Sequence, residues 1–283
     1  MAATAPVARD FRGKVVIVTG SSNGIGRATA KLFAQLGAKV TITGRSAQSA
    51  AQTREILKTA GALDENICEV LGDLTDDAIA KKIVDDTVAK FGKIDVLVNN
   101  AGGTTCDDGG LGFAIPIDSF DYTMRVNVRS IILLVQHAQP FLELTQGAVV
   151  NVSSIAAHHF TSGSLNPYYA ISKSAVDQLT VQLAGRLIEK NIRVNAVNPG
   201  LIKTEIFSKL GMSDTNVDKM YDMHTQRNII PIGRMGEPDD IAKVIVFLSD
   251  RSQSEFVIGQ RLVTDGGSNL RNELLSSLFV GLV

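Results

Sequence analysis

Short runs of β-branched and apolar residues alternate with longer segments of helical periodicity along the whole chain. The first run, 14–19, reads as a buried strand, and an amphipathic helix is predicted over 26–36. The other predicted strands are 39–43, 67–71, 94–98, 148–152, 193–197 and 261–264, and the other predicted helices are 47–60, 76–91, 118–144, 169–190 and 239–249. Strand followed by helix, repeated, predicts an α/β fold in which a doubly wound parallel sheet is covered by helices on both faces.

The pattern also bears on domain organisation. No linker rich in Pro, Ser or Gly divides the 283 residues, a length that suits one large α/β domain. We expect a single domain over 1–283, with an N-terminal extension at about 1–10 and a C-terminal tail at about 269–283. The weakly patterned segment 203–228 follows a strand, and it is predicted to form a substrate lid over the strand ends.

Charge and hydropathy narrow the function classes. The formal net charge is −1, from 28 basic and 29 acidic residues, so electrostatics gives no reason to expect nucleic acid or an anionic membrane surface as a partner. No run approaches the roughly 18 apolar residues that a membrane span needs. Residues 1–10 lack the apolar stretch of a secretory signal, so we expect a cytoplasmic or otherwise intracellular protein.

Cysteine and histidine spacing gives no indication of a metal centre. Cys68 and Cys106 lie far apart and are interpreted as reduced thiols of an intracellular protein. The four histidines, at 137, 158, 159 and 224, show no His-x-x-x-His spacing. We therefore predict no metal, and we leave open a substrate contact for His158 and His159.

A glycine-rich turn separates the first strand from the first helix. Its sequence, Thr-Gly-Ser-Ser-Asn-Gly-Ile-Gly at 19–26, allows a tight turn and a close approach of backbone to a pyrophosphate. The helix N-terminus that follows supplies free N–H groups and the positive end of the helix dipole. This position between strand and helix favours dinucleotide binding over an ordinary turn. The candidate cofactor-binding residues here are Gly20, Ser22, Asn23, Gly24, Ile25 and Gly26.

The end of the second strand bears on the choice of dinucleotide. NAD-binding proteins often carry an acidic residue near this position, which accepts hydrogen bonds from the ribose 2′-hydroxyl. Here the strand ends in Arg45, whose guanidinium suits a 2′-phosphate, so NADP(H) is favoured and NAD(H) remains the alternative. Asp73, with Leu74 beside it, follows the third strand and is predicted to contact adenine, to cap the next helix near Thr75, or both.

Tyr169 and Lys173 are the candidate proton-transfer pair. A spacing of four puts both side chains on one face of a helix, one turn apart. A lysine ammonium favours the phenolate, so we expect the pKa of Tyr169 to be lowered toward working pH. Tyr168 is five residues from Lys173 and turns away on a helix, whereas Ser153 is a weaker candidate than Ser154 because adjacent strand residues point to opposite faces.

Together these features resemble the single-domain short-chain dehydrogenase/reductase family over nearly the whole chain. The matching elements, in order, are 19–26, Asn99-Asn100-Ala101-Gly102, Asn127, Ser153-Ser154, 169–173, Pro199-Gly200, 234–238 and 265–267. The resemblance implies a Rossmann-like doubly wound parallel sheet of about seven strands. It also implies reversible hydride transfer between a nicotinamide and a carbonyl/alcohol pair.

The resemblance further implies catalytic roles. Tyr169 is the expected general acid in reduction and general base in oxidation, and Lys173 the residue that lowers its pKa and bonds the nicotinamide ribose. Ser154 is expected to hydrogen-bond the substrate oxygen. Asn127 is expected to hold a helix backbone and a water near Lys173, which would link the site to solvent.

Cofactor contacts are implied in the same way. Asn99 is expected to contact the cofactor, helped by the backbone of Asn100, Ala101 and Gly102. Pro199, Gly200 and Thr204 are expected to flank the nicotinamide carboxamide, with Ile202 in the same segment. The interval from Ser154 to Tyr169 is slightly longer than is usual in the family, so we expect the loop 158–167 to bulge and reshape the substrate pocket.

The resulting prediction is an NADP(H)-dependent oxidoreductase that acts on a small-molecule carbonyl or secondary alcohol. The alternatives are an NAD-dependent alcohol or sugar dehydrogenase of the same fold, and a catalytically silent dinucleotide-binding protein. Sugar, steroid, retinoid, tropinone-like ketone and acyl substrates all remain open, because loops set the specificity. By resemblance, a homodimer or homotetramer is expected to form through the helices at 118–144 and 169–190.

Overall fold

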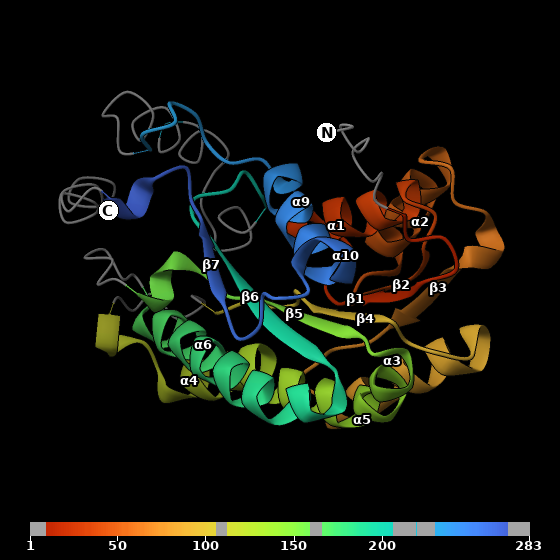
Figure 1. Ribbon diagram of the computed structural model, residues 1–283. Helices are drawn as coiled ribbons and strands as arrows, with labels where there is room; N and C mark the ends of the chain where they lie inside the picture. The colour runs from red at the N-terminus through yellow and green to blue at the C-terminus, as the bar shows by residue number, and fades with distance from the viewer. Residues whose placement is uncertain (1–9, 106–111, 159–165, 206–218, 220–229, 271–283) are drawn as a thin grey trace, which may run out of the picture.

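A computed structural model describes residues 10–105, 112–158, 166–205, 219 and 230–270. Within these residues, seven strands form one parallel sheet in the order β3-β2-β1-β4-β5-β6-β7 (Figure 1). The strands are β1 (Val15–Val18), β2 (Lys39–Gly44), β3 (Ile67–Leu71), β4 (Val96–Asn99), β5 (Ala148–Val152), β6 (Arg193–Pro199) and β7 (Arg261–Thr264). The predicted Rossmann-like doubly wound sheet is therefore confirmed.

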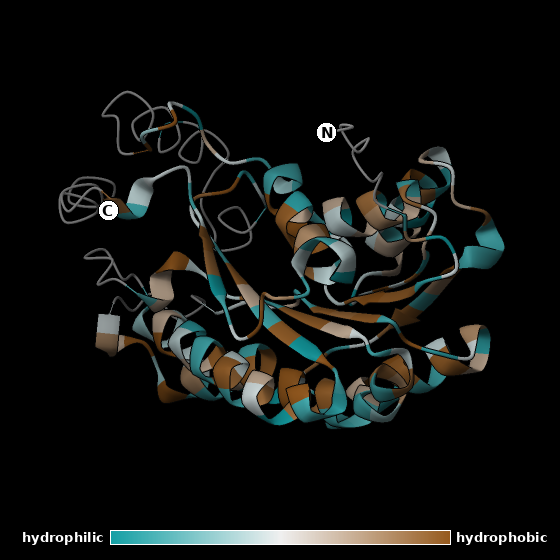
Figure 2. Cartoon of the chain, in the orientation of Figure 1, coloured by the Kyte–Doolittle hydropathy of each residue, from teal (hydrophilic) through white to brown (hydrophobic). Residues whose placement is uncertain are grey.

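Helices cover both faces of the sheet (Figure 1). One face carries α1 (Gly24–Gln35), α2 (Ala47–Thr59), α9 (Pro238–Ser249) and the short α10 (Arg251–Ser254). The other carries α3 (Asp77–Phe91), α4 (Ile117–Met124), α5 (Ser130–Thr145) and α6 (Pro167–Leu187). Alternate strand residues supply the two cores: Val16 and Val18 pack toward α1 and α9, whereas Ile17 packs toward α3 and α5. β1 consequently reads as a continuous apolar run, whereas β6 and β7 also carry hydrophilic residues (Figure 2).

The strand order determines where a ligand can bind. β1 pairs with β2 on one side and with β4 on the other, so the order reverses direction between β1 and β4. Ligands of open α/β sheets bind at the carboxyl ends of the strands beside such a reversal. The loops that follow β1, β4, β5 and β6 all leave the sheet at this edge, and they carry the predicted site residues.

The predicted helix over 118–144 differs from the structure. It is divided into α4 and α5 by a π-helical turn, Arg125–Arg129, with Asn127 at its centre. A π-turn adds one residue to a helical turn and changes the direction of the side chains, and such turns are frequent at functional sites. The helical periodicity of hydrophobic residues continues through the turn, so the sequence pattern does not predict it.

Several predicted segments lie largely outside the described residues. They include the lid at 203–228, the N-terminal extension, most of the C-terminal tail and the loop at 158–167, as well as Cys106, His159 and His224. In the part of the chain that the structure describes, no helix is both long enough and apolar enough to cross a membrane.

Candidate active site

The turn between β1 and α1 forms a backbone cradle. Gly20 and Gly24 have φ angles of 62° and 51°, in the left-handed region that favours glycine. A Cβ on Gly26 would collide with the carbonyl oxygen of Gly20 and with the Asn100 side chain. The N-terminus of α1 has no side-chain cap, and its first turn contains no acidic residue. Its first N–H groups thus lack a side-chain partner, which fits an anionic ligand such as a pyrophosphate.

The residues at the end of β4 hold this cradle in place by hydrogen bonds. Asn100 Nδ2 donates to the carbonyl oxygens of Thr19 and Gly20 at 2.8 and 3.1 Å. The Thr19 hydroxyl in turn accepts from the backbone N–H groups of Asn100 and Ala101, both at 3.0 Å. A Cβ on Gly20 would lie 2.8 Å from Ala101 Cα. The structure therefore brings the predicted residues of the two loops into direct contact.

The side chain of Asn99, which was expected to contact the cofactor together with the residues that follow it, is directed into the sheet. It is 1% exposed, and its Nδ2 donates to Asn151 Oδ1 at 2.8 Å, inside the sheet. Strand alternation turns the two adjacent asparagines in different directions, so Asn100 supports the cradle and Asn99 braces β4 against β5.

Arg45 lies at the rim beyond β2. Its guanidinium is 3.6 Å from the Asp73 carboxylate and donates to the Tyr122 hydroxyl of α4 at 3.3 Å. Asp73 accepts from the backbone N–H and the hydroxyl of Thr75, both at 2.9 Å. Helix α3 begins only at Asp77 with Asp76 as its N-cap, so the expectation that Asp73 caps a helix near Thr75 is wrong, and Asp73 closes the preceding turn.

The segment after β6 passes beside the cradle. A Cβ on Gly24 would lie 3.2 Å from Thr204 Cγ2, and a Cβ on Gly200 would lie 2.8 Å from Asp265 Cα. Ile202 is buried and bridges to Gly236. These contacts hold the segment that begins at Pro199 across the end of the sheet.

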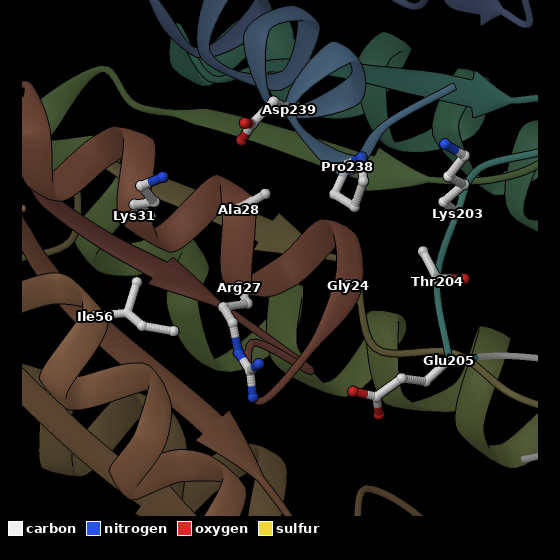
Figure 3. A pocket seen from close by; sticks show the side chains of 10 residues that line it. All are labelled: Gly24, Arg27, Ala28, Lys31, Ile56, Lys203, Thr204, Glu205, Pro238 and Asp239. Carbon is white, nitrogen blue, oxygen red and sulfur yellow. The ribbon is translucent and has the colours of Figure 1, made fainter. Parts of the chain in front are cut away.

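An open cavity of about 520 Å³ lies next to this segment (Figure 3). It is lined by residues of α1 from Gly24 to Lys31, by Ile56 of α2, by Lys203 to Glu205 and by the start of α9. Gly24 and Thr204 of the predicted cofactor residues line it, whereas Tyr169, Lys173 and Ser154 do not. The candidate proton-transfer residues consequently lie outside this cavity.

Tyr169 stands in the first turn of α6. Asn166 is the N-cap, and its Oδ1 accepts from the backbone N–H groups of Tyr168 and Tyr169 at 3.1 and 3.3 Å. Its Nδ2 donates to the Thr105 carbonyl oxygen at 2.9 Å. The helix start is thereby tied to the loop after β4, which also carries Gly102. Sequence reasoning missed Asn166, although an Asn directly before Pro167 is a recognisable helix start.

Lys173 lies one turn further along α6 and is buried. Its Nζ donates to the Val152 carbonyl oxygen at 2.8 Å and lies 5.5 Å from the centre of the Tyr169 ring. Burial lowers the pKa of Lys173 to about 8, and the carboxylate of Asp177 acts in the opposite direction. The predicted shared face of Tyr169 and Lys173 is thus present.

The expected pKa of Tyr169 requires a correction. Burial raises the pKa of the phenol above its ordinary value, and a hydrogen bond with Ser154 opposes the rise. In the protein alone, the phenol therefore keeps its proton, and its hydroxyl neighbour is Ser154.

Asn127 joins the site from the π-turn. Its Oδ1 accepts from the Gly103 N–H at 2.8 Å, and its Nδ2 donates to the Ser172 hydroxyl at 2.8 Å. A Cβ on Gly102 would lie 3.2 Å from both Asn127 Oδ1 and Lys173 Nζ. A larger residue than glycine at 102 would crowd the space between the side chains of Asn127 and Lys173.

The two weaker candidates are directed elsewhere. The Ser153 hydroxyl is buried and donates to the Lys173 carbonyl oxygen at 3.1 Å. The Tyr168 hydroxyl donates to the Ile115 carbonyl oxygen at 3.1 Å, and its ring packs edge-to-face against Phe113 and Phe120. Both hydroxyl groups are therefore bonded to backbone carbonyl groups, and Ser154 and Tyr169 are the candidates of the two adjacent pairs to contact a substrate. Among the described residues, no group of three or more His, Cys, Asp or Glu side chains could hold a metal ion.

Comparison with known proteins identifies the family. The sequence model of the family described as enoyl-(acyl carrier protein) reductase matches residues 20–269. The chain is 37% identical over 258 residues to a 3-oxoacyl-acyl-carrier-protein reductase of Thermotoga maritima, with 91% of this chain and 98% of that protein covered.

Two solved structures from Caenorhabditis elegans are also similar. One is a short-chain dehydrogenase/reductase of unknown function with cofactor, with a TM-score of 0.89 and 42% identity, covering 92% of this chain and 96% of that one. The other is a glucose dehydrogenase in the apo form, with a TM-score of 0.78 and 45% identity, covering 92% and 99%.

The chain belongs to the short-chain dehydrogenase/reductase family. It is an oxidoreductase that acts on CH–OH donors with a nicotinamide dinucleotide.

Proposed function

We propose that the protein is an NADP(H)-dependent oxidoreductase in which Tyr169 transfers a proton to or from the oxygen of a small carbonyl or secondary alcohol substrate. The observation that carries the proposal is the convergence of Tyr169, Ser154 and Lys173 at the sheet edge that holds the glycine cradle. The chain as a whole is proposed to be one domain, with 203–228 as a substrate lid.

The cradle fits the dinucleotide. The uncapped N-terminus of α1, with Ser22, Asn23 and Ile25 in its turn, would hold the pyrophosphate, and Arg45, Asp73 and Leu74 would hold the adenosine end. Asn100, Ala101 and Gly102, together with 199–204, would flank the nicotinamide end. The bound nicotinamide supplies or accepts the hydride.

The polar side chains of the site would stabilise the developing charge and transfer the proton. During reduction, negative charge develops on the substrate oxygen, and the hydroxyl groups of Tyr169 and Ser154 stabilise it by hydrogen bonding. Tyr169 then gives its proton to that oxygen, and in oxidation it takes the proton back. The Lys173 ammonium offsets the charge left on the phenolate. Asn127, whose Nδ2 donates to the Ser172 hydroxyl, would hold a water near Lys173 that links the site to solvent.

The preference for NADP(H) rests on Arg45, since no acidic residue ends β2. We expect Arg45→Ala to weaken NADPH binding by about 10-fold or more, because one charged hydrogen-bonding group contributes about 1.5–3 kcal/mol, and to leave NADH binding nearly unchanged. Arg54→Ala, at a half-buried arginine of α2 that pairs with Asp64, is the control. An unchanged NADPH-to-NADH affinity ratio in Arg45→Ala would favour the NAD-dependent alternative.

Turnover separates the enzyme from the silent dinucleotide-binding alternative. NADPH oxidation should be followed with a panel of carbonyl compounds: a 3-oxoacyl thioester, a keto steroid, a diketone and a sugar lactone. The similar proteins named above make an acyl and a sugar substrate the first two tests. We expect steady turnover with at least one class, whereas tight NADPH binding without turnover across the panel supports the silent protein.

A homodimer or homotetramer is proposed through α5 and α6. These helices leave Ile132, Ile171 and Val181 exposed at 37, 43 and 36%. Sedimentation velocity should show a species at least twice the mass of the chain, and a monomer at micromolar concentration would contradict the proposal. An intracellular, cytoplasmic location is likewise proposed, because NADP(H) is held inside cells; fractionation with a tagged protein tests it.

A further inference from the structure

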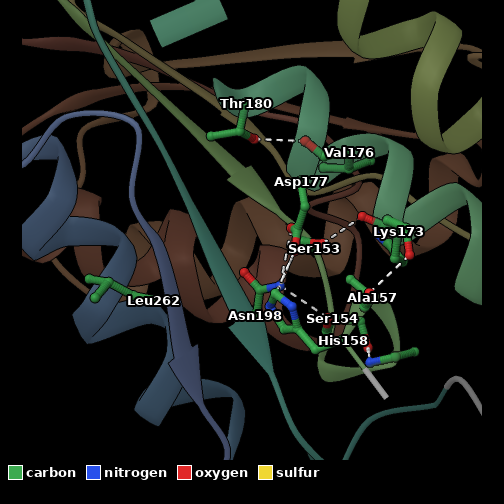
Figure 4. A network of polar contacts seen from close by, with 12 residues as sticks. Ser153, Ser154, Ala157, His158, Lys173, Val176, Asp177, Thr180, Asn198 and Leu262 are labelled. Atoms are coloured by element: carbon green, nitrogen blue, oxygen red, sulfur yellow. Dashed lines mark hydrogen bonds and ion pairs between the residues drawn. The ribbon is translucent and has the colours of Figure 1, made fainter. Parts of the chain in front are cut away.

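A buried polar cluster lies behind the Ser154 loop, and the proposed chemistry does not use it. It consists of Asp177, one turn after Lys173 on α6, Asn198 near the end of β6, and His158 after the 3-10 turn Ile155–Ala157. We call these three residues the Asp177 cluster (Figure 4). The Asp177 side chain is 5% exposed, and Asn198 is fully buried. A carboxylate so deeply buried requires hydrogen-bond partners or a compensating charge.

Asn198 supplies the first partner. Its Nδ2 lies 3.1 and 3.0 Å from the two oxygens of Asp177, and 3.1 Å from the carbonyl oxygen of Ser154. An amide has two N–H hydrogens, so one serves the carboxylate and the other serves Ser154. The single side chain of Asn198 therefore connects the buried charge to the backbone of the proposed substrate-binding serine.

His158 supplies the second partner. Its Nε2 lies 3.2 Å from Asp177 Oδ2 and 3.1 Å from Asn198 Nδ2. Because both hydrogens of the Asn198 amide are engaged, and because Nε2 faces a carboxylate, we assign a hydrogen to Nε2 that is donated to Asp177. The ring is 29% exposed, so it closes the cluster on the solvent side.

These contacts fix the Ser154 loop to the helix that carries Tyr169. Besides the bonds at Ser154 and His158, the Ala157 carbonyl oxygen accepts from the Ser174 hydroxyl of α6 at 2.9 Å. Within the loop, Ser154 Oγ accepts from the Ala156 N–H at 3.1 Å, which orients the hydroxyl. The position of Ser154 relative to Tyr169 is therefore set by three bonds to α6 and β6.

The carboxylate of Asp177 also attracts the ammonium of Lys173, one helical turn earlier on α6. On α6 itself, the neighbours of Lys173 are Tyr169 and Asp177. The other elements around it contribute neutral groups: the Val152 carbonyl from β5, Gly102 from the loop after β4 and Asn127 from the π-turn. Asp177 is thus the carboxylate that compensates the buried ammonium within the described residues. Its attraction opposes the lowering of the Lys173 pKa by burial.

We propose that Asp177, held by Asn198 and His158, is a positioning residue of this active site: it fixes the Ser154 loop against α6 and is the counter-charge of Lys173. This inference rests on the proposed function, because it assigns Ser154 and Lys173 their roles. It adds three residues that lie outside the motifs of the sequence.

The first test is Asp177→Asn, which keeps the volume and removes the charge. We expect kcat for NADPH oxidation with the fastest panel ketone to fall about 10- to 100-fold, the size that small misplacements of reacting groups produce, while KM and the NADPH Kd change less than about threefold. The alkaline limb of the kcat profile should move to lower pH, because Lys173 then loses its proton more readily. Asp85→Asn, at an exposed ion pair on α3, is the control and should change neither quantity.

A second pair of variants keeps the test valid if Asp177→Asn fails to fold. His158 is at the surface end of the cluster, and Gln can donate from nearly the same position whereas Phe cannot. We expect His158→Phe to lower kcat about 3- to 10-fold and His158→Gln to restore most of it. In nitrogen-edited NMR spectra of the cofactor-free protein, the Nε2 hydrogen of His158 should be visible, and it should disappear by exchange in Asp177→Asn.

The outcomes separate this inference from the proposed function. If Asp177→Asn keeps kcat within twofold with an unshifted pH profile, or if His158→Phe and His158→Gln both match the wild type, the positioning role is wrong. If Tyr169→Phe remains inactive in the same preparation, the proposed function is unaffected by that failure. Full activity of Tyr169→Phe would instead remove the function on which the inference rests.

Discussion

The dinucleotide cradle after β1 and the proton-transfer site after β5 share one edge of the sheet but are built from different materials. The cradle is made of backbone: glycines in left-handed conformations, an uncapped helix start and carbonyl groups held by Asn100. The proton-transfer site is made of buried side chains, among them Lys173, Asn127 and Asp177. A backbone site depends on the absence of side chains, and a side-chain site depends on partners from distant parts of the chain.

The cradle is therefore most sensitive to added atoms. Gly26→Ala would place a Cβ against the Gly20 carbonyl oxygen and the Asn100 side chain. We expect NADPH affinity to fall about 100-fold or more, because the backbone must move away from the position in which it can approach a pyrophosphate. Isothermal titration with NADPH measures this loss.

The matched control is Gly185→Ala on α6, where an added Cβ meets nothing within 4 Å. There the change should leave NADPH affinity unaltered and raise the free energy of unfolding by up to about 1 kcal/mol, because alanine is the better helix former. Unchanged NADPH binding in Gly26→Ala would show that the cradle is not the dinucleotide site.

The proton-transfer site is instead sensitive to charge. The pKa of Lys173 is about 8 in the folded protein, below its value of roughly 10.4 in an unfolded chain. Between these values the unfolded state binds more protons, so Lys173 makes the protein more stable as pH rises through this window. At 1.36 kcal/mol per unit, the gain from about pH 8 to about pH 9.5 is about 2 kcal/mol.

Lys173→Met should remove this dependence. Urea unfolding should show a higher free energy of unfolding for Lys173→Met than for the wild type at pH 7. This difference should shrink as the pH rises to 9.5, because the wild type becomes more stable. Lys81→Met, at an exposed lysine on α3, should run parallel to the wild type. A constant difference between Lys173→Met and wild type across this range would contradict the burial of a charged Lys173.

The smallest expected effect is at the rim of the cradle. Tyr122→Phe removes the acceptor for Arg45 at 3.3 Å, an exposed contact. We expect NADPH affinity to fall about threefold and NADH affinity to stay constant, because an exposed hydrogen bond contributes about 0.5–1 kcal/mol. In an Arg45→Ala background the same change should have no further effect, which a double-mutant cycle tests.

The same contrast explains how much could be predicted from the sequence. The strands at 67–71, 148–152 and 261–264 agree with the structure to the residue, because short runs rich in β-branched and apolar residues are typical of strands. The glycine turn and the Tyr169–Lys173 spacing are local, so the geometry of both follows from short segments. What depends on neighbours distant in sequence could not be predicted in this way.

Three residues illustrate that limit. Asn99 and Asn100 are chemically identical, and only the pairing of β4 with β5 decides that Asn99 faces Asn151. The π-turn at Asn127 leaves no mark in the hydrophobic period. The hydrogen bond from Lys173 Nζ to the Val152 carbonyl oxygen depends on the packing of α6 against β5, which the spacing of Tyr169 and Lys173 does not reveal.

The most direct test of the central claim compares two adjacent phenols. Tyr169→Phe and Tyr168→Phe make the same chemical change in one helical turn, and the Tyr168 hydroxyl bonds a backbone carbonyl away from the site. With NADPH and the fastest panel ketone, we expect Tyr169→Phe to lower kcat about 10²- to 10⁴-fold with NADPH affinity retained, and Tyr168→Phe to stay within about tenfold of wild type. Wild-type turnover in Tyr169→Phe would contradict the account.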